Sequence, residues 1–128
     1  MPASEKELMG ASTALLVLAA LNTAPSYGYE LLRRINDQAQ GLFTWQEGTL
    51  YPVLHRLETD GLLRAQWQDA DAPSKGKTGG GARRRKYYYI TAKGRKHLAQ
   101  STAQWQAFNE LVTRITGVAH GIRKPAIP

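Results

Sequence analysis

The hydrophobic positions in the first sixty residues recur at helical spacing and predict three helices. The first is expected at residues 8–21, ending before Pro25 because the residue that precedes a proline resists the α conformation. The second is expected at residues 27–40, with Gly41 ending it. The third is the best defined, since its apolar residues keep the spacing i, i+3, i+4, i+7. These residues are Leu50, Val53, Leu54 and Leu57.

The two ends of this third helix are marked unequally. Asp60 and Gly61 close it at the C-terminal end. At the other end, Thr44 and Glu47 fit a capping box, but a glycine and a proline further along favour a start nearer Gln46. The sequence leaves both starts open.

An antiparallel hairpin is predicted next, with strands at residues 63–68 and 85–91. The side chains of the second strand alternate between two faces, which is typical of a half-buried strand. One face carries Tyr87 and Tyr89, and the other carries Tyr88 and Ile90. Residues 69–82 between the strands are rich in Gly, Lys and Pro, so we expect a long, polar hairpin tip.

A fourth helix is predicted from Thr91, an N-cap residue, to about residue 115. Its apolar residues repeat every seven positions with an offset of three, which is the pattern of a coiled-coil seam. The seam residues are Leu98, Trp105, Phe108, Val112 and Ile115. Because this helix follows a complete small core, it has no partner left within the chain.

This order of elements, three helices, a hairpin and a long helix, predicts a mainly α fold of the winged helix-turn-helix type. In that fold the second helix of the turn enters the major groove of DNA, and a two-stranded antiparallel hairpin forms the wing. The length of 128 residues allows one such domain and little more.

The net charge of +7 is unevenly distributed. Residues 1–60 carry four basic and seven acidic side chains, a net of −3, whereas residues 61–128 carry thirteen basic and three acidic ones, a net of +10. The basic residues gather at the hairpin tip: Lys75, Lys77, Arg83, Arg84, Arg85 and Lys86. Such a run is either a solvated face or a site for a polyanion, with nucleic acid ahead of a membrane surface.

Several other classes of protein are excluded by what the sequence lacks. There is no cysteine, which excludes disulfides and thiolate chemistry, and a cytoplasmic protein is the plain interpretation. The longest apolar run, residues 14–21, is far shorter than the about 20 residues that cross a membrane. Residues 76–78 end like a P-loop, but Asp71 stands where its first glycine is required. The three histidines show no metal-ligand spacing. Without a thiolate, a complete P-loop or a metal site, we expect neither an enzyme nor a cofactor.

Three motifs in this chain resemble those of the PadR transcriptional regulators. Residues 47–62 resemble the family's recognition helix, residues 27–31 the start of its second helix, and residues 84–94 its second wing strand. The short C-terminal part resembles the subfamily with a single dimerisation helix. The resemblance implies a homodimer in which each chain has a winged helix-turn-helix domain at 1–91, with its wing at about 62–91, and a dimerisation helix at 92–117. The prolines at 125 and 128 predict a flexible tail at 118–128.

Candidate DNA contacts follow from the outward face of the third helix and from the basic wing. From the helix we expect Gln46, Thr49, Tyr51, His55 and Arg56, and from the wing Lys75, Lys77, Arg83, Arg84, Arg85 and Lys86. Arg56 has the geometry to pair with guanine, whereas His55 is either a DNA contact or an exposed neutral imidazole.

Trp105 has two interpretations, dimer packing or a wall of a ligand site. The chain resembles multidrug-binding PadR-like repressors, which implies a site for planar aromatic compounds between two copies of Trp105. The implied lining is Ala14, Leu15, Ala19, Ser101, Trp105 and Asn109. With alanines at 14 and 19 and an asparagine at 109, this lining is less polar than the corresponding lining in those repressors.

Together these features predict a homodimeric repressor that binds a palindromic operator in double-stranded DNA. Two alternatives remain open at this point. A winged-helix protein-interaction module would keep the core and the seam without needing a basic wing. A basic RNA-binding protein would show no preference for a palindromic duplex.

Overall fold

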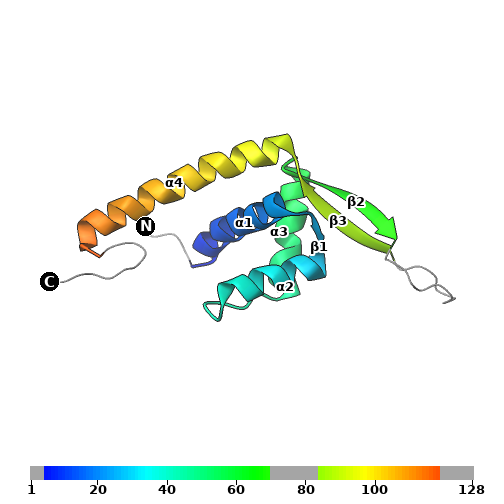
Figure 1. The fold of residues 1–128 in the computed structure, drawn as a ribbon, viewed down its shortest axis with the longest axis horizontal. Helices are drawn as coiled ribbons and strands as arrows, with labels where there is room; N and C mark the ends of the chain where they lie inside the picture. Colours follow the sequence, from blue (N-terminus) through cyan, green and yellow to red (C-terminus); the bar gives the residue numbers. More distant parts are fainter. Residues whose placement is uncertain (1–4, 70–83, 119–128) are drawn as a thin grey trace.

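The computed structural model describes residues 5–69 and 84–118, and it confirms the predicted fold class. A small helical body carries a sheet on one side and a long C-terminal helix across its top (Figure 1). The elements in chain order are α1 (Glu5–Thr23), β1 (Ser26–Tyr27), α2 (Gly28–Ala39), α3 (Glu47–Thr59), β2 (Leu63–Asp69), β3 (Arg84–Ile90) and α4 (Ala92–Thr116). None of the helices within these ranges has the length and hydropathy to cross a membrane.

The core lies where α1, α2 and α3 meet the sheet. Its most buried side chains come from all four parts, since Leu18, Leu31, Leu54 and Leu63 are fully removed from solvent. In Figure 1, α1 lies between α4 and α2, so the first helix is covered on two sides. Burial of these leucines, at about 2 kcal/mol each, supplies the main stabilisation of the body.

The structure confirms the predicted C-terminal end of α2 and decides between the two starts that the sequence left open for α3. The chain turns out of α2 at Gln40, which adopts the left-handed conformation with φ of 47°, and Gly41 follows with φ of 86°. Helix α3 begins at Glu47 after an extended Gln46, and no side chain caps its N-terminus. The start near Gln46 is therefore correct, and the alternative start at a Thr44 capping box is wrong.

The sheet contains one strand more than the predicted hairpin, because β1 pairs with the free edge of β3. The strand order is β1-β3-β2, and both pairings are antiparallel. Ser26 lies opposite Tyr88, and Tyr27 lies opposite Tyr87. This third strand attaches the start of α2 directly to the wing.

The junction between the sheet and α4 is tightly packed. The Thr91 side chain accepts a hydrogen bond from the Gly94 amide at 2.9 Å, as the predicted N-cap requires, and donates to the Gly61 carbonyl at 2.8 Å. A Cβ on Gly94 would lie 2.1 Å from the Leu62 carbonyl oxygen, so only glycine fits there. From this anchor α4 runs over α1 and past its N-terminal end (Figure 1).

Candidate nucleic-acid interface

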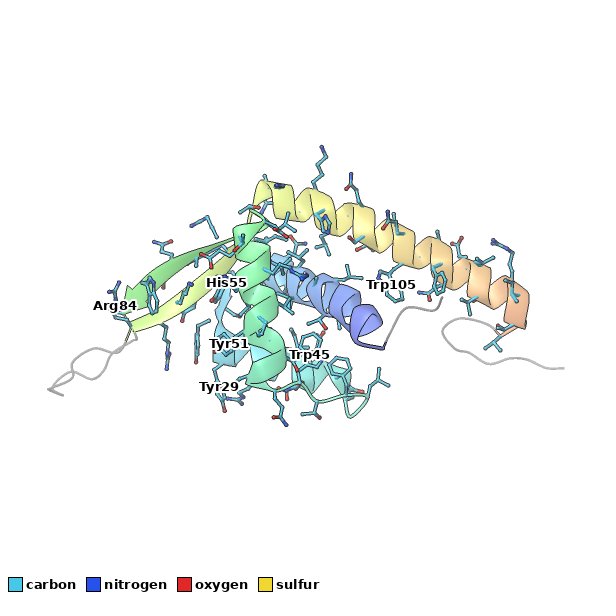
Figure 2. The ribbon with its side chains drawn as sticks, turned by 180° about the vertical axis from the view of Figure 1, so that it is seen from behind. Tyr29, Trp45, Tyr51, His55, Arg84 and Trp105 are labelled. Atoms are coloured by element: carbon cyan, nitrogen blue, oxygen red, sulfur yellow. The ribbon has the colours of Figure 1, made fainter. Side chains whose placement is uncertain are left out.

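Helix α3 presents two faces of opposite character. Leu50, Leu54 and Leu57 are buried in the core. The predicted contact residues Thr49, Tyr51, His55 and Arg56 are exposed on the other side, and Gln46 is exposed at the N-terminus. Figure 2 shows Tyr51 and His55 along the same helix, about one turn apart in sequence. The periodicity of the sequence was sufficient to separate these faces.

Tyr51 has a fixed position because it lies over the first residue of α2. A Cβ on Gly28 would come within 2.3 Å of the Tyr51 hydroxyl oxygen, so the glycine makes room for the ring. Partial burial raises the pKa of the Tyr51 hydroxyl, and the Glu47 carboxylate raises it further. The phenol therefore stays protonated at neutral pH and can donate a hydrogen bond to a phosphate oxygen.

The chain that enters α3 is held by Asn36 from α2. Its side-chain oxygen accepts a hydrogen bond from the Trp45 amide at 2.8 Å, and its nitrogen donates to the Trp45 carbonyl at 3.0 Å. The Trp45 ring is buried and stacks on Phe43 at a centroid distance of 5.1 Å. Asn36 therefore fixes the backbone one residue before Gln46, a role that the sequence analysis missed because such a contact has no sequence signature.

Two exposed residues of α2, Tyr29 and Arg33, lie beside the N-terminal half of α3. Tyr29 follows Gly28 and is exposed, and the Arg33 guanidinium lies 6.0 Å from its ring centroid. Since Tyr51 lies against Gly28, Tyr29 continues the exposed surface of α3 onto the N-terminal turn of α2 (Figure 2). The sequence analysis assigned no DNA contact to α2, although the amphipathic pattern of this helix places both residues outside.

The wing is joined to α3 by an ion pair. Lys86 on β3 lies 3.3 Å from Glu58 near the end of α3. Partial burial opposes the charge on Lys86, but its neighbours Tyr88 and Glu58 outweigh that effect and raise the pKa of the lysine. Lys86 is therefore charged, and in the free protein it is directed to Glu58.

The sheet register distributes the basic wing residues between two faces. Residues opposite each other in an antiparallel pair point to the same side. Lys86 lies opposite Trp67 and points toward α3, where Arg84 joins it with its guanidinium 5.6 Å from the Trp67 ring centroid. Arg85 alternates to the other face and lies over Tyr27 at 4.3 Å. Arg84 and Lys86 therefore share a face with α3 and Arg85 does not; Lys75, Lys77 and Arg83 lie outside the described residues.

The residues predicted for a ligand site are distributed over two parts of α1 and one face of α4. Trp105 is exposed on the side of α4 toward α1 and contacts Phe108 edge-on at 6.3 Å (Figure 2). Ser101, Asn109, Ala14 and Leu15 are each half-buried. Ala19 instead lines a groove between α1 and α2, which none of the α4 residues reaches. Of the predicted dimer seam, Leu98 is already buried in the core of its own protomer.

A family model described as the transcriptional regulator PadR-like family matches residues 17–100. The chain belongs to this family. An uncharacterised protein of Lysinibacillus sphaericus is 30% identical over 97 residues, which cover 76% of this chain and 81% of that protein. A PadR family transcriptional regulator from Eggerthella lenta has 33% identity and a TM-score of 0.67, with 86% of each chain covered. A transcriptional regulator from Clostridium thermocellum has 26% identity and a TM-score of 0.69, over 88% of this chain and 97% of that one.

As a PadR-like protein, the chain is a transcriptional regulator and not an enzyme. The matched residues include α2, α3 and both wing strands, together with the anchored first turns of α4. No group of three or more metal-ligating side chains occurs in the part of the chain that the structure describes. The PadR match ends before Trp105, so it says nothing about the exposed apolar residues further along α4.

Proposed function

We propose that this PadR-like regulator is a cytoplasmic repressor that binds a palindromic operator as a homodimer. The observation that carries this proposal is the exposed face of α3, which is flanked by a basic wing on the same side. An isolated α3 would fit many roles. A helix with an outward polar face next to Arg84 and Lys86 fits the major groove and the adjoining phosphates.

The N-terminal turn of α3 supplies the first group of proposed contacts. Gln46, Thr49 and Tyr51 are exposed there, where free backbone amides and hydroxyl groups suit phosphate oxygens or base edges. Arg56 lies about one turn beyond Tyr51 and forms no ion pair with any described carboxylate. Its guanidinium is therefore free for a two-fold hydrogen bond to guanine, and His55 beside it is the other base-reading candidate.

The wing supplies the second group, which binds phosphates or the minor groove. Arg84 and Lys86 share the α3 side of the sheet, and Lys75, Lys77 and Arg83 belong to the segment that joins its strands. Charge of this kind binds DNA without regard to sequence and makes the affinity fall steeply with salt. The wing therefore strengthens binding, and α3 provides the selectivity.

The homodimer is proposed from the exposed seam of α4. Trp105, Phe108, Val112 and Ile115 are all exposed in the protomer although they are apolar. A contiguous apolar surface of this kind marks an interaction site. Two copies related by a two-fold axis would place two recognition helices on successive half-sites of the operator.

A planar aromatic compound is the proposed effector, bound between two copies of Trp105. The half-exposed indole and the edge-on contact with Phe108 leave one face of the ring available for stacking. Replacing Trp105 by Ala should abolish ligand-induced quenching of tryptophan fluorescence and release of DNA, whereas Trp105→Phe should keep part of the affinity. Equal ligand affinity in the Ala variant would remove Trp105 from the site.

The test of the function is a titration of the protein onto duplex DNA from the promoter beside its own gene, at two salt concentrations. We expect tight binding to a two-fold site with half-sites about one helical turn apart, and much weaker binding to a scrambled duplex. Replacing Lys75, Lys77, Arg83 and Arg84 by Ala should weaken binding and reduce the salt slope while the dimer stays intact. Equal, weak binding to all promoters and to scrambled DNA would instead favour a protein-interaction module.

A further inference from the structure

A small open pocket of about 300 Å³ lies where the C-terminal end of α1, the sheet and the first turn of α4 meet. Its polar lining is Asn22, Thr23, Arg64, Tyr89 and Arg95, and we call it the Arg64–Arg95 pocket. The described lining contains two arginines and no carboxylate, and neither arginine forms an ion pair with a described residue. Two uncompensated positive charges at one cavity create a potential that attracts an anion.

Arg64 is held in place by an aromatic ring and not by a carboxylate. The Gln68 side chain donates a hydrogen bond to the Tyr89 hydroxyl at 2.5 Å and so fixes the ring. The Arg64 guanidinium lies over this ring, 4.5 Å from its centroid. Stacking uses the flat face of a guanidinium and leaves its N–H groups free in the plane. Arg64 is therefore ordered before a ligand arrives, which lowers the entropic cost of binding.

Arg95 is ordered by the start of α4. It follows Gly94, whose close contact with the Leu62 carbonyl oxygen fixes the first turn of the helix. The Arg95 guanidinium donates one long hydrogen bond, of 3.4 Å, to the Ile90 carbonyl oxygen. Because a guanidinium has five N–H groups, most donors of Arg95 have no partner among the described residues and are available to a ligand.

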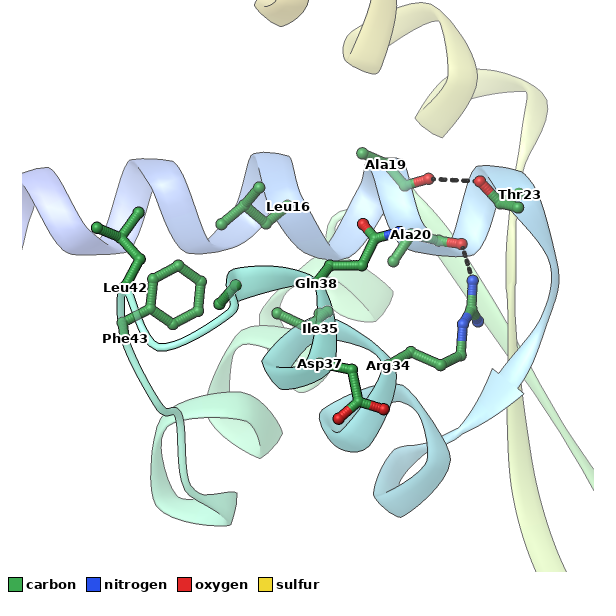
Figure 3. A pocket seen from close by; sticks show the side chains of 11 residues that line it. Leu16, Ala19, Ala20, Thr23, Arg34, Ile35, Asp37, Gln38, Leu42 and Phe43 are labelled. Atoms are coloured by element: carbon green, nitrogen blue, oxygen red, sulfur yellow. Dashed lines mark hydrogen bonds between the residues drawn. The ribbon is translucent and has the colours of Figure 1, made fainter.

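The end of α1 does not need these two arginines, because Arg34 from α2 already binds its carbonyl groups. The Arg34 guanidinium donates to the Ala20 carbonyl oxygen at 2.7 Å, as Figure 3 shows, and to that of Ala24 at 3.0 Å. No hydrogen bond joins Arg64 or Arg95 to a described residue of α1. Capping of α1 therefore does not account for the two arginines at the pocket.

The pocket lies on the side of the sheet that faces away from α3. Arg64 is opposite Tyr89 in the register, so the two side chains share one face. Lys86 stands three residues before Tyr89 on the same strand and therefore points to the other face, where it pairs with Glu58 of α3. DNA that is bound at α3 would not cover the pocket, which favours a free anion as the occupant.

We propose that the Arg64–Arg95 pocket binds a small free anion of the phosphate type, either inorganic phosphate or a small phosphate monoester. The two guanidinium groups carry two positive charges, and a phosphate monoester carries about −1.5 to −2 at pH 7. Guanidinium groups bind such oxygens through paired hydrogen bonds. The pocket has the volume of about ten water molecules, which leaves room for a small organic group beside the phosphate. One anion held by both arginines ties β2 of the wing to the first turn of α4.

The test is calorimetric titration of the full-length protein with inorganic phosphate and with glycerol phosphate, without DNA and at constant ionic strength. We expect saturable binding of one phosphate per protomer at millimolar concentration, and at least about tenfold weaker binding of acetate, which carries a single charge. Arg64→Gln and Arg95→Gln should each raise the dissociation constant for phosphate at least about tenfold, because each removes charged hydrogen bonds to the anion. Arg64→Lys should have a smaller effect, since it keeps the charge but loses the paired donors.

Arg114→Gln is the matched control for the loss of one positive charge. Arg114 is also an exposed arginine of α4 and does not line the pocket, so this variant should bind phosphate like wild type. Arg64 and Arg95 are exposed, and thermal melting followed by circular dichroism should show that their variants are folded. Equal phosphate affinity in Arg64→Gln, Arg95→Gln and wild type would overturn the site. Acetate binding as tight as that of phosphate would overturn the assignment of the ligand class.

A parallel measurement of operator affinity in phosphate-free buffer distinguishes a free anion from a phosphate of DNA. We expect Arg64→Gln and Arg95→Gln to bind the operator as Arg114→Gln does. If the free protein bound no phosphate and only the two pocket variants lost operator affinity, the pocket would hold a DNA phosphate and the free anion would be overturned. A protein that binds phosphate at this pocket but no operator would overturn the proposed repressor and leave the pocket assignment in place.

Discussion

The body of the protein and the outer part of α4 use apolar residues in opposite ways. In the body, Leu18, Leu50 and Leu54 have no exposed surface. On the outer part of α4, four apolar side chains are 39% to 74% exposed: Phe108, Leu111, Val112 and Ile115. Both regions occur on regular helices with similar spacing of apolar residues. The comparison shows that the same sequence pattern is buried inside one chain in the first case and left exposed in the second, where we propose that a second chain covers it.

The boundary between the two regions lies within α4 itself. Gly94 and Leu98 are buried against the body, and the side chains beyond Asn109 are mainly exposed. The N-cap at Thr91 and the contact at Gly94 fix the direction of the helix. We therefore expect the stability of the body to be independent of protein concentration, and that of the outer helix to depend on it.

The largest effect should come from removing a core leucine. Leu54→Ala should lower the free energy of unfolding by about 4 kcal/mol, because the cavity forms at a fully buried site. Urea denaturation should give the same loss at low and high protein concentration. Ile115→Ala is the matched change in the other region, and its effect should disappear when the protein is diluted to the monomer. A concentration-independent loss in Ile115→Ala would contradict the comparison.

A substitution at the junction between the body and α4 should lower the unfolding free energy by nearly as much. Gly94→Ala should destabilise the protein by about 3 kcal/mol, since the new methyl group would lie 2.1 Å from the Leu62 carbonyl oxygen. Gly48→Ala is the control, because Gly48 is also in a helix but has no atom within 4 Å of the added Cβ. That variant should be more stable than wild type by up to about 1 kcal/mol. Equal unfolding midpoints for the two variants would show that the junction is not tightly packed.

The sequence predicted the body well because its signals are local. Helical spacing separated the buried leucines of α3 from exposed Thr49 and His55, and Thr91 was correctly identified as an N-cap. The winged helix-turn-helix order and the family also followed from the sequence.

Three features could not be predicted because they depend on contacts between distant residues. Strand β1 has two residues, too few to show alternation, and it exists only because β3 pairs with it. Alternation along the second wing strand separated Tyr87 and Tyr89 from Tyr88 and Ile90, but it did not tell which face meets α3. The contact of Asn36 with Trp45 joins a side chain to the backbone, and the types of the two residues do not predict it.

Asn36→Ala should have an intermediate effect on the body and a separate effect on DNA. The change leaves the amide and carbonyl of Trp45 without their partner, which should cost about 2 kcal/mol of unfolding free energy. Operator affinity should also fall about tenfold at a temperature where the variant is fully folded, because the start of α3 is no longer held. Gln38→Ala, an exposed change on the same helix, should alter neither property. Loss of stability with unchanged operator affinity would limit Asn36 to a structural role.

The smallest effect on stability should come from the ion pair between the wing and α3. Lys86 and Glu58 are both about one-third exposed, so Lys86→Gln and Glu58→Gln should each change the unfolding free energy by less than about 0.5 kcal/mol. Their effects on operator affinity should have opposite signs. Lys86→Gln removes a phosphate-binding charge and should weaken binding about threefold at low salt, whereas Glu58→Gln releases Lys86 and removes a carboxylate that repels DNA, so it should strengthen binding. If both variants weakened binding equally, the ion pair would be holding the wing in position, and Lys86 would not contact DNA.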